Sequence, residues 1–495
     1  MVNAGRGFAD LHNHQFAQLA FGGRVLWGSA AAADSELGSC RPEHGPHGLF
    51  DLPGNLAQVL LGTGSVAALL GHRTDGAPDF PAWPGWHDLT HQAVPRSALK
   101  RAVDGGLRLM VMPAVNNALL GRLTRGHDYH DMAAVDRQLR AARQFEAMID
   151  AEAGGPGRGW YRIAETPAQA REAIGQGRLA VVLGIEVDHF LGDTVGPRST
   201  VRDLAAQLDR YHALGVRHLF PIHLQDCAYG GAAFATSLHW SRNSGPVSRA
   251  NPPLSLPVWR MTTVARTADG YAYRGGHCNA GGLTPLGVTL IRLLMERGMM
   301  IDVDHASASA RADVLRLTGA AGYPVVAGHA ELRSLAARGD RSEFLLTDAE
   351  VTGIGRHGGI VAPKLRQPAV AAPDDVKGTA EAFLYAYRRV RELLPDAVIP
   401  FGTDLNGFAG MPRPRRAGVR LDYPFTAPVS GAQLGRGRLG GRDFDINTDG
   451  VAHVGMLPDL VALLIRHGLP EPEARPMLDS ALGYVRAWER AVEAG

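Results

Sequence analysis

Phe8-Ala9-Asp10-Leu11-His12-Asn13-His14 is the stretch that organises this chain, and it lies close to the start. A short apolar run ends there in two histidines spaced i, i+2. Side chains with this spacing point to the same face of an extended strand, so both imidazoles can reach one metal ion. Two ordinary surface histidines near the terminus would give the same pattern. The choice between these interpretations depends on what the later strands carry.

Length and charge restrict the classes of protein to which the chain can belong. Its 495 residues fit two or three average domains, or one barrel with long insertions. The formal net charge of +2 gives no reason to expect nucleic acid or an acidic membrane surface as partner. We expect a small-molecule substrate and leave homo-oligomerisation open. The sequence shows no signal-peptide pattern and no apolar run of membrane-spanning length, which predicts a soluble, cytoplasmic protein without a membrane partner.

The three cysteines are Cys40, Cys227 and Cys278, which lie far apart without a CxxC pattern. This spacing argues against a disulfide framework and against a thiolate zinc site. A Cys227–Cys278 disulfide stays open as an alternative that no pattern supports.

Apolar runs bounded by Gly, Pro or polar residues predict eight strands with amphipathic helices between them. This alternation indicates an α/β protein of the (β/α)8 TIM-barrel type. A doubly wound open sheet is the alternative, although no strand leads into a Gly-rich phosphate fingerprint. The predicted strands are Phe8–Leu11, Leu107–Met112, Leu179–Glu186, Val216–His223, Met299–Val303, Pro324–Ala327, Gly359–Pro363 and Val398–Gly402. The predicted helices are Met132–Glu152, Pro167–Gln176, Val201–Leu214, Leu286–Arg297, Ser309–Thr318, Thr379–Leu394, Pro458–His467 and Glu471–Ala494.

Three connections, residues 15–106, 225–281 and 405–450, are too long to be plain turns. Each follows the carboxyl end of a predicted strand, which is the face where barrel active sites are built. We interpret them as βα-loop insertions that cover this face of a single domain spanning residues 1–495.

Charged or imidazole side chains follow six of the predicted strands. At the carboxyl ends of barrel strands they would converge on one axial point. Burying so many polar groups costs several kcal/mol unless a metal or hydrogen bonds satisfy them. Nitrogen and oxygen ligands without thiolate suit zinc, with Mn, Co or Fe as alternatives. The residues are His12 and His14, Glu186, His223, His305, His329 and Asp404.

The strongest family signal is Gly281-Gly282-Leu283-Thr284-Pro285-Leu286-Gly287, followed by Ile301-Asp302-Val303-Asp304-His305-Ala306-Ser307. Gly184-Ile185-Glu186 and Gly402-Thr403-Asp404 add to it. With these motifs the sequence resembles the amidohydrolase superfamily, and within it the membrane dipeptidase family (renal dipeptidase-like, peptidase M19). The likeness runs from about Ala9 to Asp404 and leaves out the long insertions.

The resemblance implies a hydrolase that cleaves an amide C–N bond, dipeptidase-like, with two divalent metal ions, zinc being favoured. It implies that His12 and His14 bind one metal, that Glu186 bridges both, and that His305 and His329 bind the second. His223 would polarise the scissile carbonyl. Asp404 would be the general base and then the general acid. It would take a proton from the metal-bridging water, which leaves a bridging hydroxide, and pass that proton to the leaving amine. An arginine would hold the substrate carboxylate, with Arg341 preferred over Arg338.

The chain also departs from this family. It carries His12-x-His14 where the family has H-x-D, and Asn406 where the family repeats an aspartate. A superfamily enzyme of other specificity (a lactonase, deaminase or decarboxylase) is therefore the alternative, and a non-catalytic metal-binding barrel is a third. Asp404 argues against the third, because binding alone needs no proton-shuttling carboxylate. His127, His130 and His453 stay without a role.

Overall fold

The structure is a computed structural model. It describes residues 6–34, 37–52, 55, 70–76, 92–118, 121–122, 126, 128–191, 200–233, 238–242, 259–263, 273–274, 278–279, 281–336, 342–367, 370–408, 412–414 and 418–495. Among these, no helix is both long enough and apolar enough to cross a membrane.

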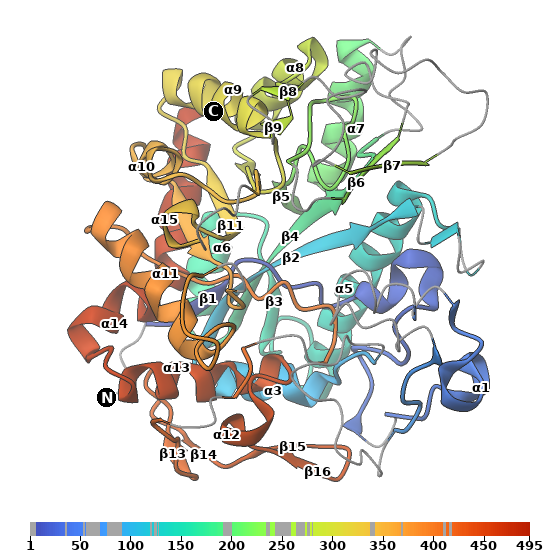
Figure 1. Ribbon diagram of the computed structural model, residues 1–495, viewed down its shortest axis with the longest axis vertical. Helices are drawn as coiled ribbons and strands as arrows, with labels where there is room; N and C mark the ends of the chain where they lie inside the picture. Colours follow the sequence, from blue (N-terminus) through green and yellow to red (C-terminus); the bar gives the residue numbers. More distant parts are fainter. Residues whose placement is uncertain are drawn as a thin grey trace.

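A curled parallel sheet forms the middle of the molecule (Figure 1). Its strands follow one another in the order β1-β2-β4-β5-β10, with β3 paired to β4, and β11 and β12 form a separate parallel pair. Every residue of β2 and β4 is buried, as expected for a sheet covered on both faces. The bounds are β1 (Phe8–Asp10), β2 (Leu107–Asn116), β3 (Tyr161–Ile163), β4 (Leu179–Val187), β5 (Val216–Leu219), β10 (Met300–Ile301), β11 (Val326–Ala330) and β12 (Ile360–Pro363).

The predicted closed eight-stranded barrel is found only in part. A single parallel bridge joins Asp302 after β10 to Val326 in β11. No strand forms in the predicted eighth segment, where single bridges join Gly402 to Lys364 and Phe401 to Asp10. The described residues therefore form an open, curled sheet and a strand pair connected by isolated bridges.

Buried carboxylates explain why the ladder stops at these points. Asp10 Oδ1 accepts hydrogen bonds from the backbone nitrogens of Thr403 (3.0 Å) and His12 (3.2 Å). Asp302 Oδ1 accepts one from the backbone nitrogen of Asp304 (2.9 Å). Backbone donors that a side chain satisfies locally do not extend a sheet ladder. The backbone at these strand ends is thus held by the Asp10 and Asp302 side chains instead of by a neighbouring strand.

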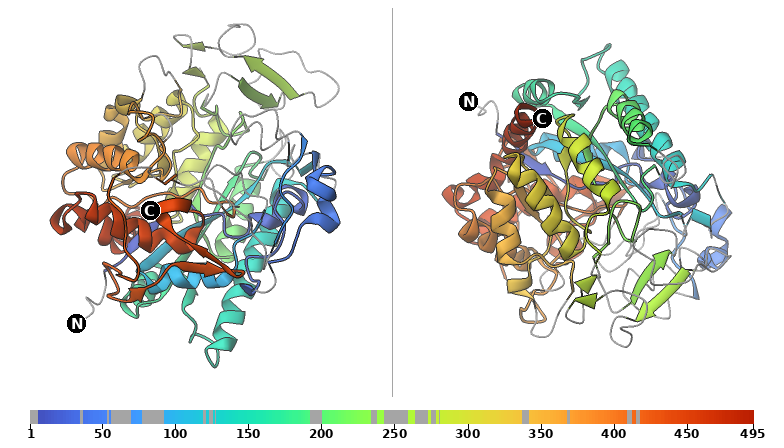
Figure 2. Two further views of the ribbon diagram at one scale, coloured as in Figure 1. Left: turned by 60° about the horizontal axis from the view of Figure 1, so that its bottom comes forward. Right: turned by 90° about the horizontal axis from the view of Figure 1, so that it is seen from above.

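Helices pack around the outside of the strands (Figure 2). α5 lies on β2, α6 on β4, α7 on β5, α8 on β10, α10 and α11 on β12, and α15 on β1. The sequence predicts most of these helices to within one or two residues, but the predicted helix Glu471–Ala494 is two helices that meet at Asp479. The α-helices are α1 (Arg41–His44), α3 (Arg96–Asp104), α5 (Asp131–Glu152), α6 (Pro167–Gly175), α7 (Val201–Ala213), α8 (Pro285–Met295), α9 (Ala308–Ala320), α10 (Asp348–Gly355), α11 (Ala380–Leu393), α12 (Ile446–Asp449), α13 (Leu457–Arg466), α14 (Glu471–Leu478) and α15 (Ser480–Ala494).

The three long connections contain elements that the sequence analysis did not predict. Residues 15–106 include α1 and α3, and residues 225–281 include the antiparallel pair β6 (Leu238–Arg242) and β7 (Trp259–Thr263), and the pair β8 (Tyr273–Arg274) and β9 (Cys278–Asn279). Residues 405–450 include two short hairpins, β13 (Phe425–Thr426) with β14 (Gln433–Leu434), and β15 (Gly437–Leu439) with β16 (Arg442–Phe444). Cys40 and Cys227 are free thiols, so the Cys227–Cys278 disulfide is not formed.

Candidate metal centre

The two histidines after β1 meet the carboxylate at the end of β4. His12 Nε2 lies 3.0 Å from Glu186 Oε2, and His14 Nε2 lies 3.2 Å from the same oxygen. The two Nε2 atoms are 3.0 Å apart. His14 Nδ1 donates to the carbonyl of Pro113 (3.0 Å), which leaves the Nε2 lone pair directed at the cluster. All three side chains are buried.

The other oxygen of Glu186 faces a second group of histidines. His305 Nε2 lies 3.1 Å from Glu186 Oε1, and His223 Nε2 lies 3.8 Å from it. His223 Nδ1 is 3.2 Å from Asp188 Oδ1, which orients the ring. One carboxylate therefore stands between two sets of imidazoles, with one oxygen toward each set.

His329 completes the ring of histidines. Its ring centre is 4.0 Å from that of His12 and 4.7 Å from that of His305. Asp304 Oδ2 accepts hydrogen bonds from both Nδ1 (2.9 Å) and the backbone nitrogen (2.7 Å) of His329. This pairing leaves Nε2 of His329 as the atom available to a ligand.

Asp404 lies beside the first group of histidines, and a lysine holds it there. Asp404 Oδ1 is 3.4 Å from His14 Nε2 and 3.8 Å from His12 Nε2. Lys364 Nζ donates to Asp404 Oδ2 at 2.7 Å. The backbone nitrogen of Asp404 donates to the carbonyl of His12 (2.8 Å), so the two strand ends are fixed to each other.

Two of these residues have a left-handed backbone conformation. His305 has φ +65° and Asp404 has φ +55°, a conformation uncommon outside glycine, although Asn, Asp and His adopt it more often than other residues. Strained backbone at polar residues of this kind clusters at functional sites. Gly402, two residues before Asp404, passes so close to the carbonyl of Gly328 that a Cβ would lie 2.0 Å from that oxygen.

Charges within the cluster shift the pKa values of its members. Burial would raise the pKa of Glu186, but the imidazoles of His12 and His223 lower it well below its usual value. Burial also acts against the ionised form of Asp404, yet the Lys364 ammonium holds its pKa well below the usual range. Burial lowers the pKa of His14, but hydrogen bonds to Asp404 and Glu186 outweigh this and raise the pKa to about 10. Burial lowers the pKa of His305 to about 4.

The donor set fits a divalent cation. Metal–nitrogen and metal–oxygen bonds of about 2.0–2.1 Å in tetrahedral geometry separate the ligand atoms by roughly 3.3 Å. The separations of 3.0–3.2 Å among His12, His14, His305 and Glu186 are close to this spacing. Bound cations would take the place of the protons that these crowded imidazoles otherwise share with the carboxylate.

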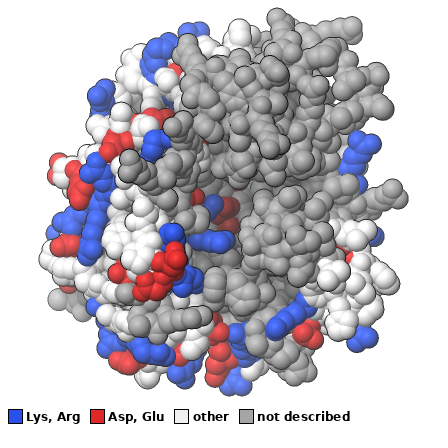
Figure 3. All heavy atoms as spheres, viewed as in Figure 1, with Lys and Arg blue, Asp and Glu red and all other residues white. Residues whose placement is uncertain are grey.

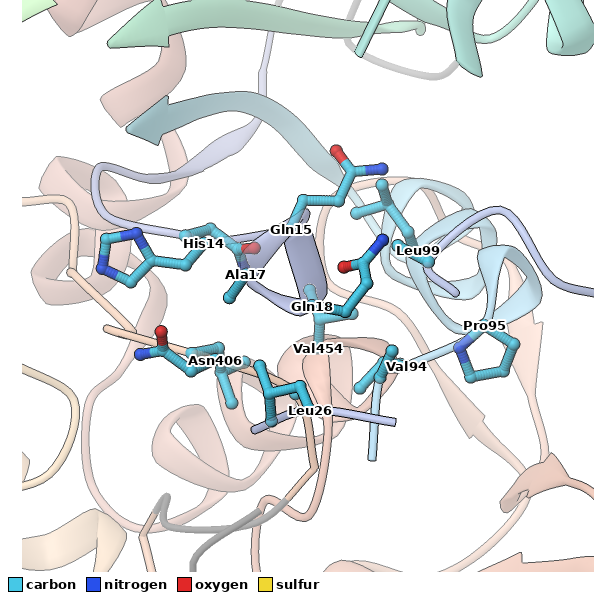
Figure 4. A pocket seen from close by; sticks show the side chains of 15 residues that line it. His14, Gln15, Ala17, Gln18, Leu26, Val94, Pro95, Leu99, Asn406 and Val454 are labelled. Atoms are coloured by element: carbon cyan, nitrogen blue, oxygen red, sulfur yellow. The ribbon is translucent and has the colours of Figure 1, made fainter. Parts of the chain in front are cut away.

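A pocket adjoins the cluster at His14. Figure 4 shows His14 and Asn406 at one end of this pocket and Pro95 and Leu99 at the other. Gln18 is among its other polar lining residues, and most of the remaining wall is apolar. The space-filling view in Figure 3 shows a hollow near the middle of one face, with acidic and basic side chains at its floor.

The structure therefore brings together seven residues that the sequence analysis singled out, namely His12, His14, Glu186, His223, His305, His329 and Asp404. Arg338, Arg341 and His127 lie outside the described residues. His130 is exposed, and His453 is buried between the rings of Phe408 and Phe444 rather than at the centre.

Sequence reasoning missed Lys364, Asp188 and Asp304. Each follows the end of a strand, and this position could have indicated a role at the site. Lys364 follows the seventh predicted strand, whereas a bridging lysine was expected only at the end of the third or fourth.

The family model of the membrane dipeptidases (peptidase family M19) matches residues 257–413, about a third of the chain. Over these residues the chain is similar to the membrane dipeptidase family. The resemblance seen in the sequence is thereby confirmed. The segment that matches the membrane dipeptidase family contains His305, His329 and Asp404, whereas His12, His14, Glu186 and His223 precede it.

Solved structures similar to this chain include three bacterial proteins. One is an amidohydrolase from Pseudomonas aeruginosa, 16% identical, covering 80% of this chain and 93% of that chain with a TM-score of 0.48. Another is a metallo peptidase from Rhodobacter sphaeroides liganded with a phosphinate mimic of the dipeptide L-Ala-D-Ala. It is 18% identical, and the match covers 79% of this chain and 89% of that chain with a TM-score of 0.49. The third is the probable dipeptidase PvdM from Pseudomonas aeruginosa. It is 16% identical, and the match covers 84% of this chain and 91% of that chain with a TM-score of 0.48.

Proposed function

We propose that this protein is a metal-dependent hydrolase that cleaves the amide C–N bond of a dipeptide or a dipeptide-like compound. The observation that carries the proposal is the position of Glu186, whose two oxygens face two different groups of histidines while Asp404 lies alongside. The match of residues 257–413 to the membrane dipeptidase family model supports the same reaction class.

The ligands we assign are His12 and His14 to one cation, His305 and His329 to the other, and Glu186 to both. Divalent cations bound there supply Lewis acidity and water that ionises near neutral pH. Asp304 and the Pro113 carbonyl hold the outer nitrogens of His329 and His14, so their ring orientations are fixed before a cation arrives.

Asp404 and His223 are the residues to which we assign proton transfer and carbonyl binding. Asp404 Oδ1 would take the proton from the attacking water and return it to the leaving amine. Lys364 keeps this carboxylate ionised, as a base must be. His223 Nε2 would donate to the carbonyl oxygen of the scissile bond, and Asp188 keeps the ring in place through Nδ1. Arg341 stays the proposed contact for the substrate's terminal carboxylate.

The experiment is metal analysis of the purified protein combined with a hydrolysis screen of L,L- and L,D-dipeptides. We expect Glu186→Gln to lose both activity and bound metal. The matched control is Glu489→Gln, which removes a surface carboxylate paired with Arg171 and should change neither. Full activity of protein with no bound metal would contradict the proposal.

A hydrolase of other specificity is favoured by one residue, His14, at a position where the dipeptidase family has aspartate. The same screen therefore includes lactones and aminated ring compounds. Turnover of one of these together with inactivity on every dipeptide would replace the dipeptidase assignment and keep the metal centre.

A further inference from the structure

A second group of metal-ligand side chains lies in the first long connection. Cys40, His44 and His72 each offer one ligand atom, and these three atoms lie within 4.8 Å of one another. Cys40 and His44 are buried and His72 is half-buried. Figure 1 places α1, which ends at His44, at the edge of the molecule. None of the three residues belongs to the centre around Glu186.

The local sequence brings these side chains together. Cys40 precedes α1 and His44 ends it, and the i, i+4 spacing places both on one face of the helical turn. The backbone nitrogen of His72 donates to the carbonyl of His47 (2.9 Å). The His72 ring lies against Gly48, where a Cβ would come within 2.5 Å of its atoms, so only glycine leaves room for it. Gly48 also has φ +68°.

Hydrogen bonds settle which ring nitrogens face inward. His44 Nε2 donates to the carbonyl of Arg24 (3.0 Å), which leaves a lone pair on Nδ1 in the neutral ring. Asn55 Nδ2 donates to the Gly48 carbonyl (2.9 Å), so its Oδ1 is the atom that accepts from His72 Nδ1 (2.8 Å). His72 then carries its lone pair on Nε2.

The two inward nitrogens face each other. His44 Nδ1 and His72 Nε2 are 3.1 Å apart, and two lone pairs at this distance repel unless a proton or a cation lies between them. Cys40 Sγ is 3.8 Å from His72 Nε2. Tetrahedral zinc, with bonds of about 2.0 Å to nitrogen and 2.3 Å to sulfur, separates such ligand atoms by roughly 3.3–3.6 Å. The observed separations lie within a few tenths of an ångström of this range.

A carboxylate stands beside the group. Asp51 is buried, and its Oδ2 lies 3.6 Å from His44 Nδ1. A thiolate and a carboxylate together carry two negative charges. They would balance a divalent cation and so reduce the cost of burying it.

We propose that Cys40, His44 and His72 bind a structural divalent cation, with the Asp51 carboxylate beside them as balancing charge. Zinc fits the combination of one sulfur with two imidazoles best. The cation would link His72 to the helical turn formed by residues 40–44. Through the His44 bond to Arg24 it would also steady the segment that leads from His14 along the pocket to Leu26 and Ala30. The site is independent of the proposed hydrolase activity.

Cobalt substitution gives the decisive test, because the ligands assigned to the centre around Glu186 contain no sulfur. Metal-free wild-type protein is titrated with Co²⁺, and thiolate-to-cobalt charge transfer is recorded in the near ultraviolet. We expect this absorption to appear and to reach its limit by the third equivalent, because the centre around Glu186 is assigned two further cations. We expect Cys40→Ser to lack it and Cys227→Ser, which removes the other described buried thiol, to keep it. Its absence from wild type, or its loss in Cys227→Ser alone, would overturn the proposal.

Metal content measured on zinc-loaded protein gives the second readout. We expect Cys40→Ser and His72→Gln each to hold one equivalent less zinc than wild type and than Cys227→Ser. Glu186→Gln should keep the equivalent bound by Cys40, which separates failure of this site from failure of the proposed function. If Cys40→Ser does not fold, the wild-type cobalt spectrum still decides. Equal zinc content in Cys40→Ser and wild type would contradict the assignment.

Discussion

Lys364 Nζ lies 2.7 Å from Asp404 Oδ2, and this ion pair joins the end of β12 to the segment that bridges β1. The ammonium group is one reason why the pKa of Asp404 lies well below its usual range despite the burial that opposes ionisation. A carboxylate that acts as a base has to be ionised before substrate arrives. If Asp404 is the base that we propose, Lys364 is a positioning residue for it, and its effect should appear in the pH dependence of the reaction.

Lys364→Met should lower kcat/KM by about 100-fold. Without the ammonium group the pKa of Asp404 rises, so the acidic limb of the pH profile of kcat/KM should move to higher pH. Bound metal should stay unchanged, because Lys364 is not among the proposed ligands. Lys364→Arg keeps the charge and should keep the position of the acidic limb.

The matched control for this prediction is Lys377→Met. Lys377 is an exposed lysine paired with Asp374 three residues earlier in the chain. Its loss should leave the pH profile as in wild type. An unchanged acidic limb in Lys364→Met would show that Lys364 does not control the ionisation of Asp404.

His223 and His305 should differ in their effect on bound metal. His305 Nε2 is 3.1 Å from Glu186 Oε1, whereas His223 Nε2 is 3.8 Å away. Burial lowers the pKa of His223, but the charges of Glu186 and Asp188 outweigh it and raise the pKa. We expect His305→Gln to lose metal, and His223→Gln to keep it while losing about 100-fold or more in kcat. Metal analysis of the two variants side by side checks this, and equal metal loss in both would make His223 a ligand.

Gly402 should be intolerant of a side chain. Alanine there would place Cβ 2.0 Å from the carbonyl oxygen of Gly328 and 2.9 Å from His329 Cβ, so the backbone itself has to move. Such a shift would displace both Asp404 and His329, and a misplacement of about 1 Å in a catalytic group can cost roughly 100-fold in rate. We expect Gly402→Ala to lower both the melting temperature and kcat.

Gly353 provides the contrasting substitution. It lies inside α10, and its added Cβ would make an ordinary contact of 3.5 Å with Leu315. Gly353→Ala should stabilise the protein by about 0.5–1 kcal/mol through helix propensity alone. Thermal unfolding of the two variants should therefore show shifts of opposite sign. A stable, active Gly402→Ala would mean that the strand ends have more room than the structure shows.

The sequence predicted the elements whose signal is local. β2 and β4 are long apolar runs, and the residues that follow predicted strand ends lie together because parallel strands share one carboxyl edge. Closure of the barrel was not predictable in the same way. It depends on whether a backbone donor meets a neighbouring strand or a carboxylate such as Asp10, and that choice is made by contacts between residues some 390 positions apart.

The group of Cys40, His44 and His72 shows a second limit. The cysteines are widely spaced, and a histidine 28 positions beyond His44 gives no periodic signal. Its relation to Cys40 depends on Gly48, whose missing side chain leaves the space that the His72 ring fills. Ligand sets assembled across a long connection are thus visible only when the fold of that connection is known.

Glu350 links α10 to α9 and should make stability depend on pH. Its Oε1 accepts from Arg311 Nε (2.7 Å), and its Oε2 accepts from the backbone nitrogen (2.7 Å) and hydroxyl (2.8 Å) of Thr347, which begins the helix. Burial raises the pKa of Glu350, but the Arg311 charge and the Thr347 bonds outweigh it, so the folded pKa lies below the ordinary value of 4.5. A carboxyl group with a lowered folded pKa adds stability that is fully present above its unfolded pKa and is lost as pH falls through the folded pKa.

Glu350→Gln should therefore cost about 2 kcal/mol of unfolding free energy at pH 7, because Arg311 stays buried without its partner charge. The difference from wild type should hold down to about pH 4.5 and shrink at lower pH, where the wild-type carboxylate becomes protonated. Urea unfolding at a series of pH values measures it. Glu392→Gln, which removes an exposed partner of Arg389, should differ from wild type by less than about 0.5 kcal/mol throughout. A cost for Glu350→Gln that stays constant between pH 7 and pH 3 would assign its contribution to packing and hydrogen bonding rather than to its charge.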